Sequence, residues 1–291
     1  MQKNPDLEII ILTFNSEFWL KKTLSTLKTF YLDNSKKKIT VTVVDNNSED
    51  NTIEVLHRDY PWVKRVELHK NVGFAAANNI ALAQVTAPYA MLLNSDVEST
   101  SNTNLDEIIT YMDDHPQVGV VTPKVVFKNG LLDPGCHRGE PTVWASVTYF
   151  LGLEKLFPGN PRFSQYHQWY KIIDSIHTID ACSGAAMIIR TSVMKDVGLM
   201  DEQFFMYAED LDWCKRIRES GNKIIFYPFV SVIHHKYKSG IKGTSKQIAR
   251  KTRRHFYDTM LQYYDKHYRK TYPEFVRDII KYFIIIKKGA T

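Results

Sequence analysis

Apolar and amphipathic stretches alternate along the first hundred residues of the chain. Four segments are predicted to be β-strands, at 7–13, 39–45, 63–69 and 89–94, and all except 63–69 are mostly apolar. A helical pattern follows each of the first three, at about 16–30, 51–58 and 75–84. Such alternation is typical of an α/β fold with a parallel sheet built from right-handed crossovers. We therefore expect an α/β protein.

The apolar run at 89–94 ends abruptly in Asn94-Ser95-Asp96. A strand that is apolar on both faces belongs in the interior of a covered sheet, and ligands bind beyond the carboxyl ends of such strands. Asp96 is therefore expected at the mouth of the main crevice, where a carboxylate can hold a hard divalent cation that bridges nucleotide phosphates. The alternative is that Asn94 and Asp96 only begin a turn.

Short polar residues follow every predicted strand of this half: Thr13, Asn15, Asp45, Asn71, Asn78, Asn94 and Asp96. Because these turns lie at one edge of a parallel sheet, we expect the polar groups to converge there. The first strand is not followed by GxGxxG, and the chain has no GxxxxGK[ST]. Both usual phosphate-binding loops are disfavoured. The remaining possibility is a nucleotide that is held by side chains and a metal ion.

The second half is less regular. A capping-box pattern predicts a helix at about 104–114, a strand follows at 118–127, and 128–175 is rich in glycine, proline and aromatic residues. A long irregular segment is often functional, so its aromatic residues either contact sugar or lipid or pack a loop onto the core. Regular structure is expected again at 179–190, where Gly184 would let a ligand or backbone come close.

Acidic residues crowd at the start of a helix that we expect to end near Gly221, among them Glu209, Asp210 and Asp212. The helix dipole favours acidic residues there, which is a purely structural explanation. A carboxylate beside apolar walls and other carboxylates also has a raised proton affinity, as a general base requires. Two strands are predicted next, at 223–228 and 230–235, and the second ends in a histidine pair that is either structural or metal-binding.

Positive charge is concentrated at the C-terminal end. The formal net charge is +6, and 44% hydrophobic with 24% charged residues is ordinary for a protein with a substantial core. Helices are predicted at about 245–267 and 275–288, the second amphipathic and basic. Such a segment either lies on an anionic bilayer or packs against the domain. The charge suits a membrane surface, a phosphate-bearing acceptor or nucleic acid.

The cysteines and the chain start indicate the compartment. Cys136, Cys182 and Cys214 are far apart and form no CxxC pair, which favours a reducing compartment. The first residues have no signal-peptide pattern, and the late apolar cluster near 279–286 is too short to span a bilayer. We expect a cytoplasmic protein without a transmembrane anchor, with peripheral contact at the inner face of the cell membrane through its basic C-terminus.

Seven ordered stretches match a known pattern: 11–15, 43–48, 71–78, 92–96, 182–187, 198–212 and 233–235. Together they resemble the family 2 glycosyltransferases of the GT-A fold, especially bacterial rhamnosyltransferases that build O-antigen and related polysaccharides. The resemblance covers about 7–235. It implies a GT-A domain at 1–235, with a Rossmann-like, mostly parallel sheet flanked by helices. A nucleotide-sugar-binding half at 1–100, an acceptor-binding half at 101–235 and a basic helical extension at 236–291 are expected.

The resemblance also implies residue roles. Thr13, Asn15 and Asp45 would hold base and ribose, and the same nucleotide-sugar pocket would include Asn71, Gly73, Asn78, Asn94, Ser95, Gly184 and Glu209. Asp96 would be the metal-contacting end of the Asp-x-Asp motif, whose first position is here Asn94. His234 would approach the metal or diphosphate from the other side, with His235 as second candidate. Asp210 would be the catalytic base.

The implied activity is that of an inverting, metal-dependent glycosyltransferase. L-Rhamnose from dTDP-L-rhamnose would pass to a glycan or polyprenyl-linked acceptor in surface polysaccharide synthesis, with Mg²⁺ or Mn²⁺ as cofactor. One alternative is a UDP-hexose donor. A nucleotidyltransferase would show a glycine-rich, basic loop after the first strand, which Thr13-Phe14-Asn15-Ser16 is not. Nucleic-acid binding has no recognised motif to support it, and the sequence carries no signature of an oligomeric state.

Overall fold

The computed structural model describes residues 4–236 and 246–289. Its strands are β1 (Leu7–Thr13), β2 (Ile39–Asp45), β3 (Lys64–Glu67), β4 (Tyr89–Asn94), β5 (Val97–Ser99), β6 (Val118–Val126), β7 (His177–Ile179), β8 (Ala186–Arg190) and β9 (Lys223–His234). Its α-helices are α1 (Glu17–Leu27), α2 (Thr52–Asp59), α3 (Phe74–Leu82), α4 (Leu105–Asp114), α5 (Val143–Phe150), α6 (Leu153–Leu156), α7 (Thr191–Val197), α8 (Glu209–Glu219), α9 (Lys246–His267) and α10 (Glu274–Gly289). A π-helical turn η1 (Lys28–Leu32) extends α1, and a 3-10 turn η2 (Pro134–Cys136) follows β6.

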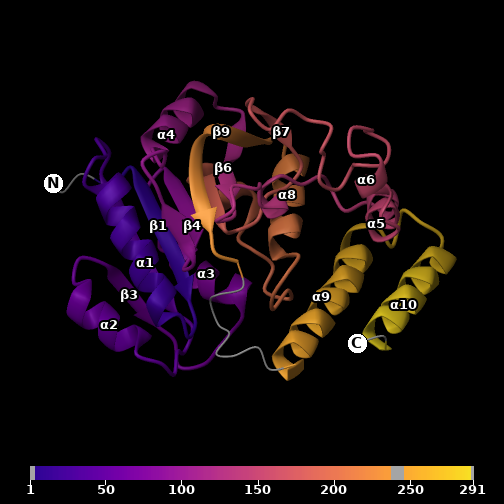
Figure 1. Ribbon diagram of the computed structural model, residues 1–291, viewed down its shortest axis with the longest axis horizontal. Helices are drawn as coiled ribbons and strands as arrows, with labels where there is room; N and C mark the ends of the chain where they lie inside the picture. Colours follow the sequence, from indigo (N-terminus) through magenta and orange to yellow (C-terminus); the bar gives the residue numbers. More distant parts are fainter. Residues whose placement is uncertain (1–3, 237–245, 290–291) are drawn as a thin grey trace.

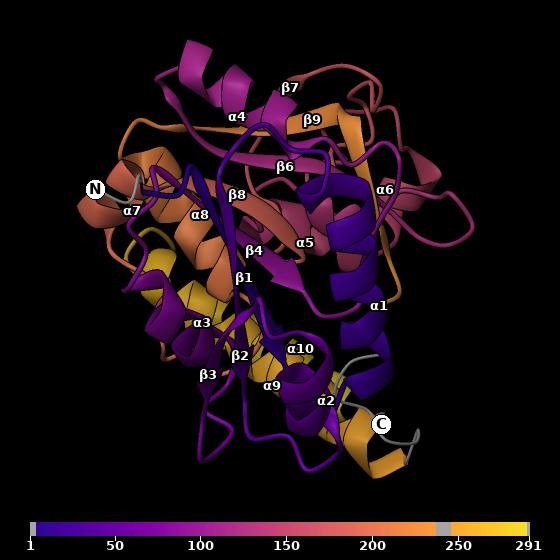
Figure 2. The same ribbon diagram turned by 90° about the vertical axis from the view of Figure 1, so that its left-hand side faces the viewer.

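The strands of the described residues form one sheet in the order β3-β2-β1-β4-β8-β6-β9-β5, with β7 paired to β9. The first four strands along the chain are mutually parallel, as their alternation with helices predicts. Helices flank this half on both sides, with α1 on one side of β1 and β4 and α3 on the other (Figure 2). The predicted α/β fold is therefore confirmed.

The second half of the sheet is mixed rather than parallel. β8 runs antiparallel to both β4 and β6, and β5 and β7 run antiparallel to β9, so only β6 and β9 pair in parallel here. β4 nevertheless lies in the sheet interior, between β1 and β8, and residues 89–93 are buried. A run that is apolar on both faces predicts burial, but it does not specify the direction of the neighbouring strand.

Two predicted strands near the end of the domain are one strand in the structure. β9 is continuous from Lys223 to His234, and its register against β6 shifts after Tyr227, so that Ser231 is the next paired residue. The shift surrounds Pro228, which has no N–H to donate to a neighbouring strand. Conversely, the predicted 179–190 segment is interrupted, because β7 ends at Ile179 and β8 begins at Ala186.

The predicted irregular segment 128–175 contains η2, α5 and α6. α5 and α6 lie beside the C-terminal helices (Figure 1), and the rings of Phe150 in α5 and Phe283 in α10 have centroids 4.9 Å apart. The two predicted C-terminal helices are present as α9 and α10, which pack against each other. Residues 237–245, within the predicted basic region, lie outside the described residues. The C-terminal helices thus pack onto the sheet domain through the aromatic segment.

Candidate active site

The ends of β1 and β2 carry the first candidate residues. Thr13 and Asp45 are partners in the strand register and are both buried. The loops that follow are bound to each other, since the Asn15 N–H donates to Ser48 Oγ (2.9 Å) and Asn15 Oδ1 accepts from the Glu49 N–H (2.7 Å). Thr13 Oγ1 and Asp45 Oδ1 are buried without a hydrogen-bond partner among the described residues, and burial raises the pKa of Asp45. Buried polar atoms normally have partners, so this edge is suited to a polar ligand.

The turn before α3 is built around Gly73. Asn46 donates its side-chain N–H to Asn71 Oδ1 (3.1 Å) and to the Gly73 carbonyl (3.3 Å). Gly73 has φ +89°, and a Cβ there would lie 2.5 Å from the carbonyl oxygen of Phe205. Only glycine fits this position. The segment that precedes α8 therefore packs directly on the polar turn of the first half.

Two other predicted nucleotide-pocket residues make internal contacts. The Asn78 amide is buried and donates to the Phe74 carbonyl one turn earlier in α3 (2.9 Å). A Cβ at Gly184 would lie 2.9 Å from the Phe74 ring, so the close approach expected at this glycine is made by an aromatic side chain. Their predicted contact with a nucleotide stays a prediction.

Asp96 lies buried just beyond β4, beside His234 at the end of β9. His234 Nε2 is 3.2 Å from Asp96 Oδ1, and Nδ1 of the same ring is 2.7 Å from Asp133 Oδ2. Burial disfavours the charged imidazolium, but the hydrogen bonds to Asp133 and Asp96 outweigh it and raise the pKa of His234 to about 9. Ser95 is also buried, and its Oγ lies 3.4 Å from Oγ of Ser16.

His235 is directed away from Asp96. Its Nε2 lies 2.7 Å from Glu98 Oε2, and its ring packs on Trp19 with centroids 4.5 Å apart. Only its backbone reaches Asp96, donating an N–H to the Asp96 carbonyl (2.9 Å). Of the two histidines that the sequence left open, His234 is therefore the one whose ring contacts Asp96.

The chemistry of this donor set fits a divalent cation. Over residues 4–236 and 246–289, no three His, Cys, Asp or Glu side chains are grouped to hold a metal ion by themselves. Mg²⁺ is usually bound by one or two carboxylates together with substrate phosphates, so a complete protein cage is not needed. A carboxylate at the second ring nitrogen is also the usual support of a metal-binding histidine, and Asp133 has that position. Asp96 and His234 are thus the residues that would hold the cation, and because a ligating imidazole must be neutral, cation binding would release the proton that His234 otherwise carries.

Asp210 lies in the first turn of α8, after a tight backbone turn. Tyr207 and Ala208 have φ +72° and +66°, which non-glycine residues rarely adopt and which recur at functional sites. Arg138 Nη2 lies 2.5 Å from Asp210 Oδ2, and the Leu211 N–H donates to Oδ1 (2.7 Å). Asp210 is therefore ion-paired and held in one orientation.

Glu209 differs from its neighbour. Burial and the charge of Asp210 raise the pKa of Glu209 to about 8, and its Oε2 has no hydrogen-bond partner in the described part of the chain. The raised proton affinity expected of this acidic cluster therefore occurs at Glu209, which is mostly protonated at neutral pH. Asp210 and Glu209 are adjacent carboxyl groups in different environments, an arrangement found where acid and base roles are divided.

A short segment that the sequence interpretation passed over joins these two groups. Asp133 contacts His234, and Arg138, five residues later, contacts Asp210. Five residues span at most roughly 18 Å, so this segment links the Asp96 site to Asp210 over a limited distance. The only signal in the sequence was a few charged residues within a loop of glycine and proline, and nothing there identified their partners.

A cavity of about 330 Å³ lies next to Asp210. Arg138, Glu209 and Asp210 form part of its wall, and side chains from α5, α9 and α10 form most of the remainder. A cavity of this size that is mostly apolar and has a small number of polar groups is typical of a small-molecule site. The C-terminal helices therefore take part in enclosing the space beside the candidate base.

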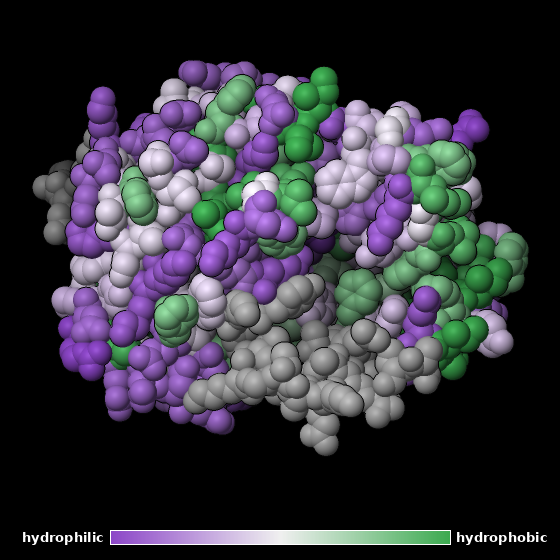
Figure 3. All heavy atoms as spheres, in the orientation of Figure 1, coloured by the Kyte–Doolittle hydropathy of each residue, from purple (hydrophilic) through white to green (hydrophobic). Residues whose placement is uncertain are grey.

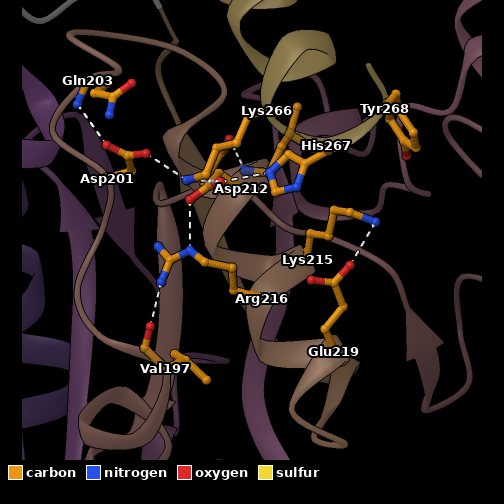
Figure 4. Close-up of polar contacts among 12 residues, drawn as sticks. Val197, Asp201, Gln203, Asp212, Lys215, Arg216, Glu219, Lys266, His267 and Tyr268 are labelled. Carbon is orange, nitrogen blue, oxygen red and sulfur yellow. Dashed lines mark hydrogen bonds and ion pairs between the residues drawn. The ribbon is translucent and has the colours of Figure 1, made fainter. Parts of the chain in front are cut away.

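Charged side chains attach α9 to α8 (Figure 4). Asp212, whose side chain is fully buried, lies 2.6 Å from Lys266 Nζ and 2.7 Å from His267 Nε2, both in α9, and 2.9 Å from Arg216 Nε. Burial raises the pKa of Asp212, but these hydrogen bonds outweigh it and lower that pKa to about 2. The helix that begins with the candidate base is thus tied to the helix that covers the cavity.

Solved structures identify the class of fold. The mannosyltransferase PcManGT from Pyrobaculum calidifontis, solved with GDP-Man and Mn²⁺, aligns with a TM-score of 0.61 at 18% identity, over 99% of this chain and 74% of that one. A crystal structure of S. aureus TarS aligns with a TM-score of 0.58 at 19% identity, over 94% of this chain and 69% of that one. The protein therefore has the GT-A fold of glycosyltransferases.

Sequence comparison identifies the family. The family model described as Glycosyl transferase family 2 matches residues 8–194. An N-acetylglucosaminyl-diphospho-decaprenol L-rhamnosyltransferase of Mycobacterium tuberculosis is 24% identical over 254 residues, 84% of this chain and 80% of that protein. The rhamnosyltransferase WbbL of Escherichia coli is 24% identical over 265 residues, 84% of this chain and 92% of that protein. The chain belongs to glycosyl transferase family 2 and is a glycosyltransferase.

Proposed function

We propose that this enzyme is an inverting glycosyltransferase that moves L-rhamnose from dTDP-L-rhamnose onto a glycan or polyprenyl-linked acceptor in bacterial surface polysaccharide synthesis. The observation that carries the proposal is the joining of Asp96, His234 and Asp210 by residues 133–138. One displacement needs a donor diphosphate and an acceptor hydroxyl at the same anomeric carbon, and this short segment links the residues proposed to act on each. The rhamnosyltransferase relatives support the choice of sugar.

In the proposed reaction Asp210 accepts the proton of an acceptor hydroxyl while that oxygen forms a bond to the anomeric carbon. The bond from this carbon to the diphosphate breaks on the opposite face, and the nucleoside diphosphate leaves with the electron pair. Arg138 holds the Asp210 carboxylate in place for the proton transfer. When bound by Asp96 and His234, Mg²⁺ or Mn²⁺ supplies a positive charge that neutralises the leaving diphosphate.

The base is assigned to Asp210 rather than to Glu209. Burial and the charge of Asp210 raise the pKa of Glu209, which favours its protonated form over the carboxylate that a general base needs. Asp210 is ion-paired with Arg138 and lines the cavity beside it.

Asp210→Asn is expected to reduce transfer at least roughly 100-fold, in the range of general acid–base catalysis. Nucleotide-sugar binding, measured by calorimetry, should stay within about threefold. Near-normal turnover of the variant would remove Asp210 from this role.

The donor is tested with a panel of nucleotide sugars. We expect nucleotide release to be fastest from dTDP-L-rhamnose, with UDP-glucose, UDP-galactose and UDP-N-acetylglucosamine as competitors. Faster release from a UDP-hexose would favour the alternative donor and leave the fold and base assignment intact. No release from any sugar nucleotide, with Mn²⁺ and a lipid-linked acceptor present, would contradict the proposed activity.

We also propose peripheral contact with an anionic membrane. Exposed apolar side chains form one surface, here called the α5–α6–α10 apolar surface, which consists of Leu151, Leu156, Phe157, Ile279, Tyr282, Ile285 and Ile286. Apolar side chains gather at the right of the molecule in Figure 3, over α6 and α10. The last turns of α10 add Lys287 and Lys288, which favour anionic lipid. Within the described ranges, no helix has the length and apolar composition needed to cross a bilayer.

A further inference from the structure

Charged and polar side chains form part of the wall of the cavity beside Asp210. Four buried polar atoms of its wall have no hydrogen-bond partner within residues 4–236 and 246–289: Arg138 Nε, Glu209 Oε2, Tyr263 Oη and Tyr264 Oη. Both tyrosines are only 4% exposed. The same wall includes Asp210, so charged and polar side chains are available at this part of the cavity for a polar head group.

Most of the rest of the wall is apolar. Its side chains include Phe150, Met260, Ile280 and Phe283, which α5, α9 and α10 contribute. A free oligosaccharide would leave hydroxyl groups without partners against such a wall, whereas a hydrocarbon chain loses no hydrogen bond there. The occupant that fits both parts of the wall is therefore amphiphilic.

The cavity wall also reaches the surface. Leu151 and Ile279 line the cavity, and they are 68% and 62% exposed. Both belong to the α5–α6–α10 apolar surface, which faces the reader's right in Figure 3. A continuous apolar path thus leads from this surface to the carboxyl groups of α8. A chain that begins in a bilayer could follow this path to Asp210.

We propose that this cavity binds the apolar chain of a polyprenyl-linked acceptor and places its head group at Asp210. The proposal rests on the proposed function for the transfer at Asp210, and it adds where the chain lies. It makes α9 and α10 part of the acceptor site rather than an appendage. It also implies selection for amphiphilic acceptors over soluble glycans, because the soluble glycan leaves the apolar wall empty.

Farnesyl monophosphate is a suitable probe, since it carries a prenyl chain and a phosphate but no sugar. Its binding to the full-length protein is measured by calorimetry, with inorganic phosphate in a parallel titration. Ile280→Trp and Met260→Trp fill the cavity from two different helices. Phe275→Trp adds the same side chain to an exposed position of α10, outside both the cavity wall and the α5–α6–α10 apolar surface, and is the matched control. Circular dichroism and thermal unfolding verify that each variant is folded.

Filling the cavity is expected to weaken farnesyl monophosphate binding about tenfold or more, with Phe275→Trp within about twofold of wild type. Inorganic phosphate should bind at least about tenfold more weakly than farnesyl monophosphate. The proposal is overturned if wild type fails to bind farnesyl monophosphate, if both cavity variants bind it as wild type does, or if inorganic phosphate binds equally well. Nucleotide-sugar binding, measured on the same samples, separates these outcomes from a failure of the proposed transferase activity.

Discussion

Replacing Asp212 by asparagine removes the charge that ties α9 to α8. The carboxylate is fully buried among Lys266, His267 and Arg216, and its pKa is about 2 instead of the ordinary 3.8. A difference of this size corresponds to about 2 kcal/mol of the free energy of unfolding at pH 7. The amide cannot neutralise the cations left around it, so the measured loss should reach or exceed that value.

The pH dependence has a definite sign. Because the pKa of Asp212 is lower in the folded state, its stabilisation is fully present above pH 3.8 and is lost as the pH falls through 2. The difference between wild type and Asp212→Asn should thus be constant between pH 5 and 7 and fall to roughly half near pH 3. Urea unfolding followed by circular dichroism at these pH values measures it.

Asp258→Asn is the matched control, because Asp258 pairs with Lys288 between α9 and α10 but its side chain is 55% exposed. An exposed pair contributes less than about 1 kcal/mol. Equal losses from the two substitutions at pH 7, or a difference that does not narrow at pH 3, would refute the assignment of Asp212 as the buried anchor of α9. Since α9 lines the cavity, Asp212→Asn should also raise the KM for a lipid-linked acceptor more than the KM for the donor.

Three further predictions concern the cation site and the membrane surface. Asp96→Ala should weaken Mn²⁺-dependent donor binding at least about tenfold, and calorimetry in which the variant keeps the wild-type Mn²⁺ dependence would contradict this. His234→Gln should lower the free energy of unfolding by roughly 3 kcal/mol at pH 6, because the folded-state pKa of His234, about 9, exceeds the ordinary 6.5. This difference between wild type and variant should be lost as the pH rises through 9. His235→Gln is the control, and equal effects of the two substitutions at pH 6 would count against the prediction. Ile285→Glu should reduce co-sedimentation with anionic liposomes, whereas unchanged binding would place the membrane contact elsewhere.

The order of strands and helices in the first half could be predicted because strand-like segments alternate there with helical patterns, and β1, β2 and β4 are mostly apolar runs. Burial of such a run in a sheet is a local consequence of its composition. The polar residues at the strand ends are likewise adjacent in sequence to the strands that position them, as Thr13 and Asp45 illustrate. The sequence therefore sufficed for the α/β class and for the edge at which the nucleotide is expected.

The pairing of distant residues was decided only by the tertiary structure. Asp133 and Arg138 stand in a loop without periodicity, and their partners His234 and Asp210 are more than 70 residues away. The choice between His234 and His235 depended on which imidazole ring lies beside Asp96 at the end of β9. The mixed strand directions in the second half of the sheet depended on the position of β8 between β4 and β6. Contacts of this kind arise when segments far apart in the sequence pack together, and the sequence separation of two residues does not determine their distance in space. Strand and helix patterns, by contrast, depend on residues that are neighbours in the sequence.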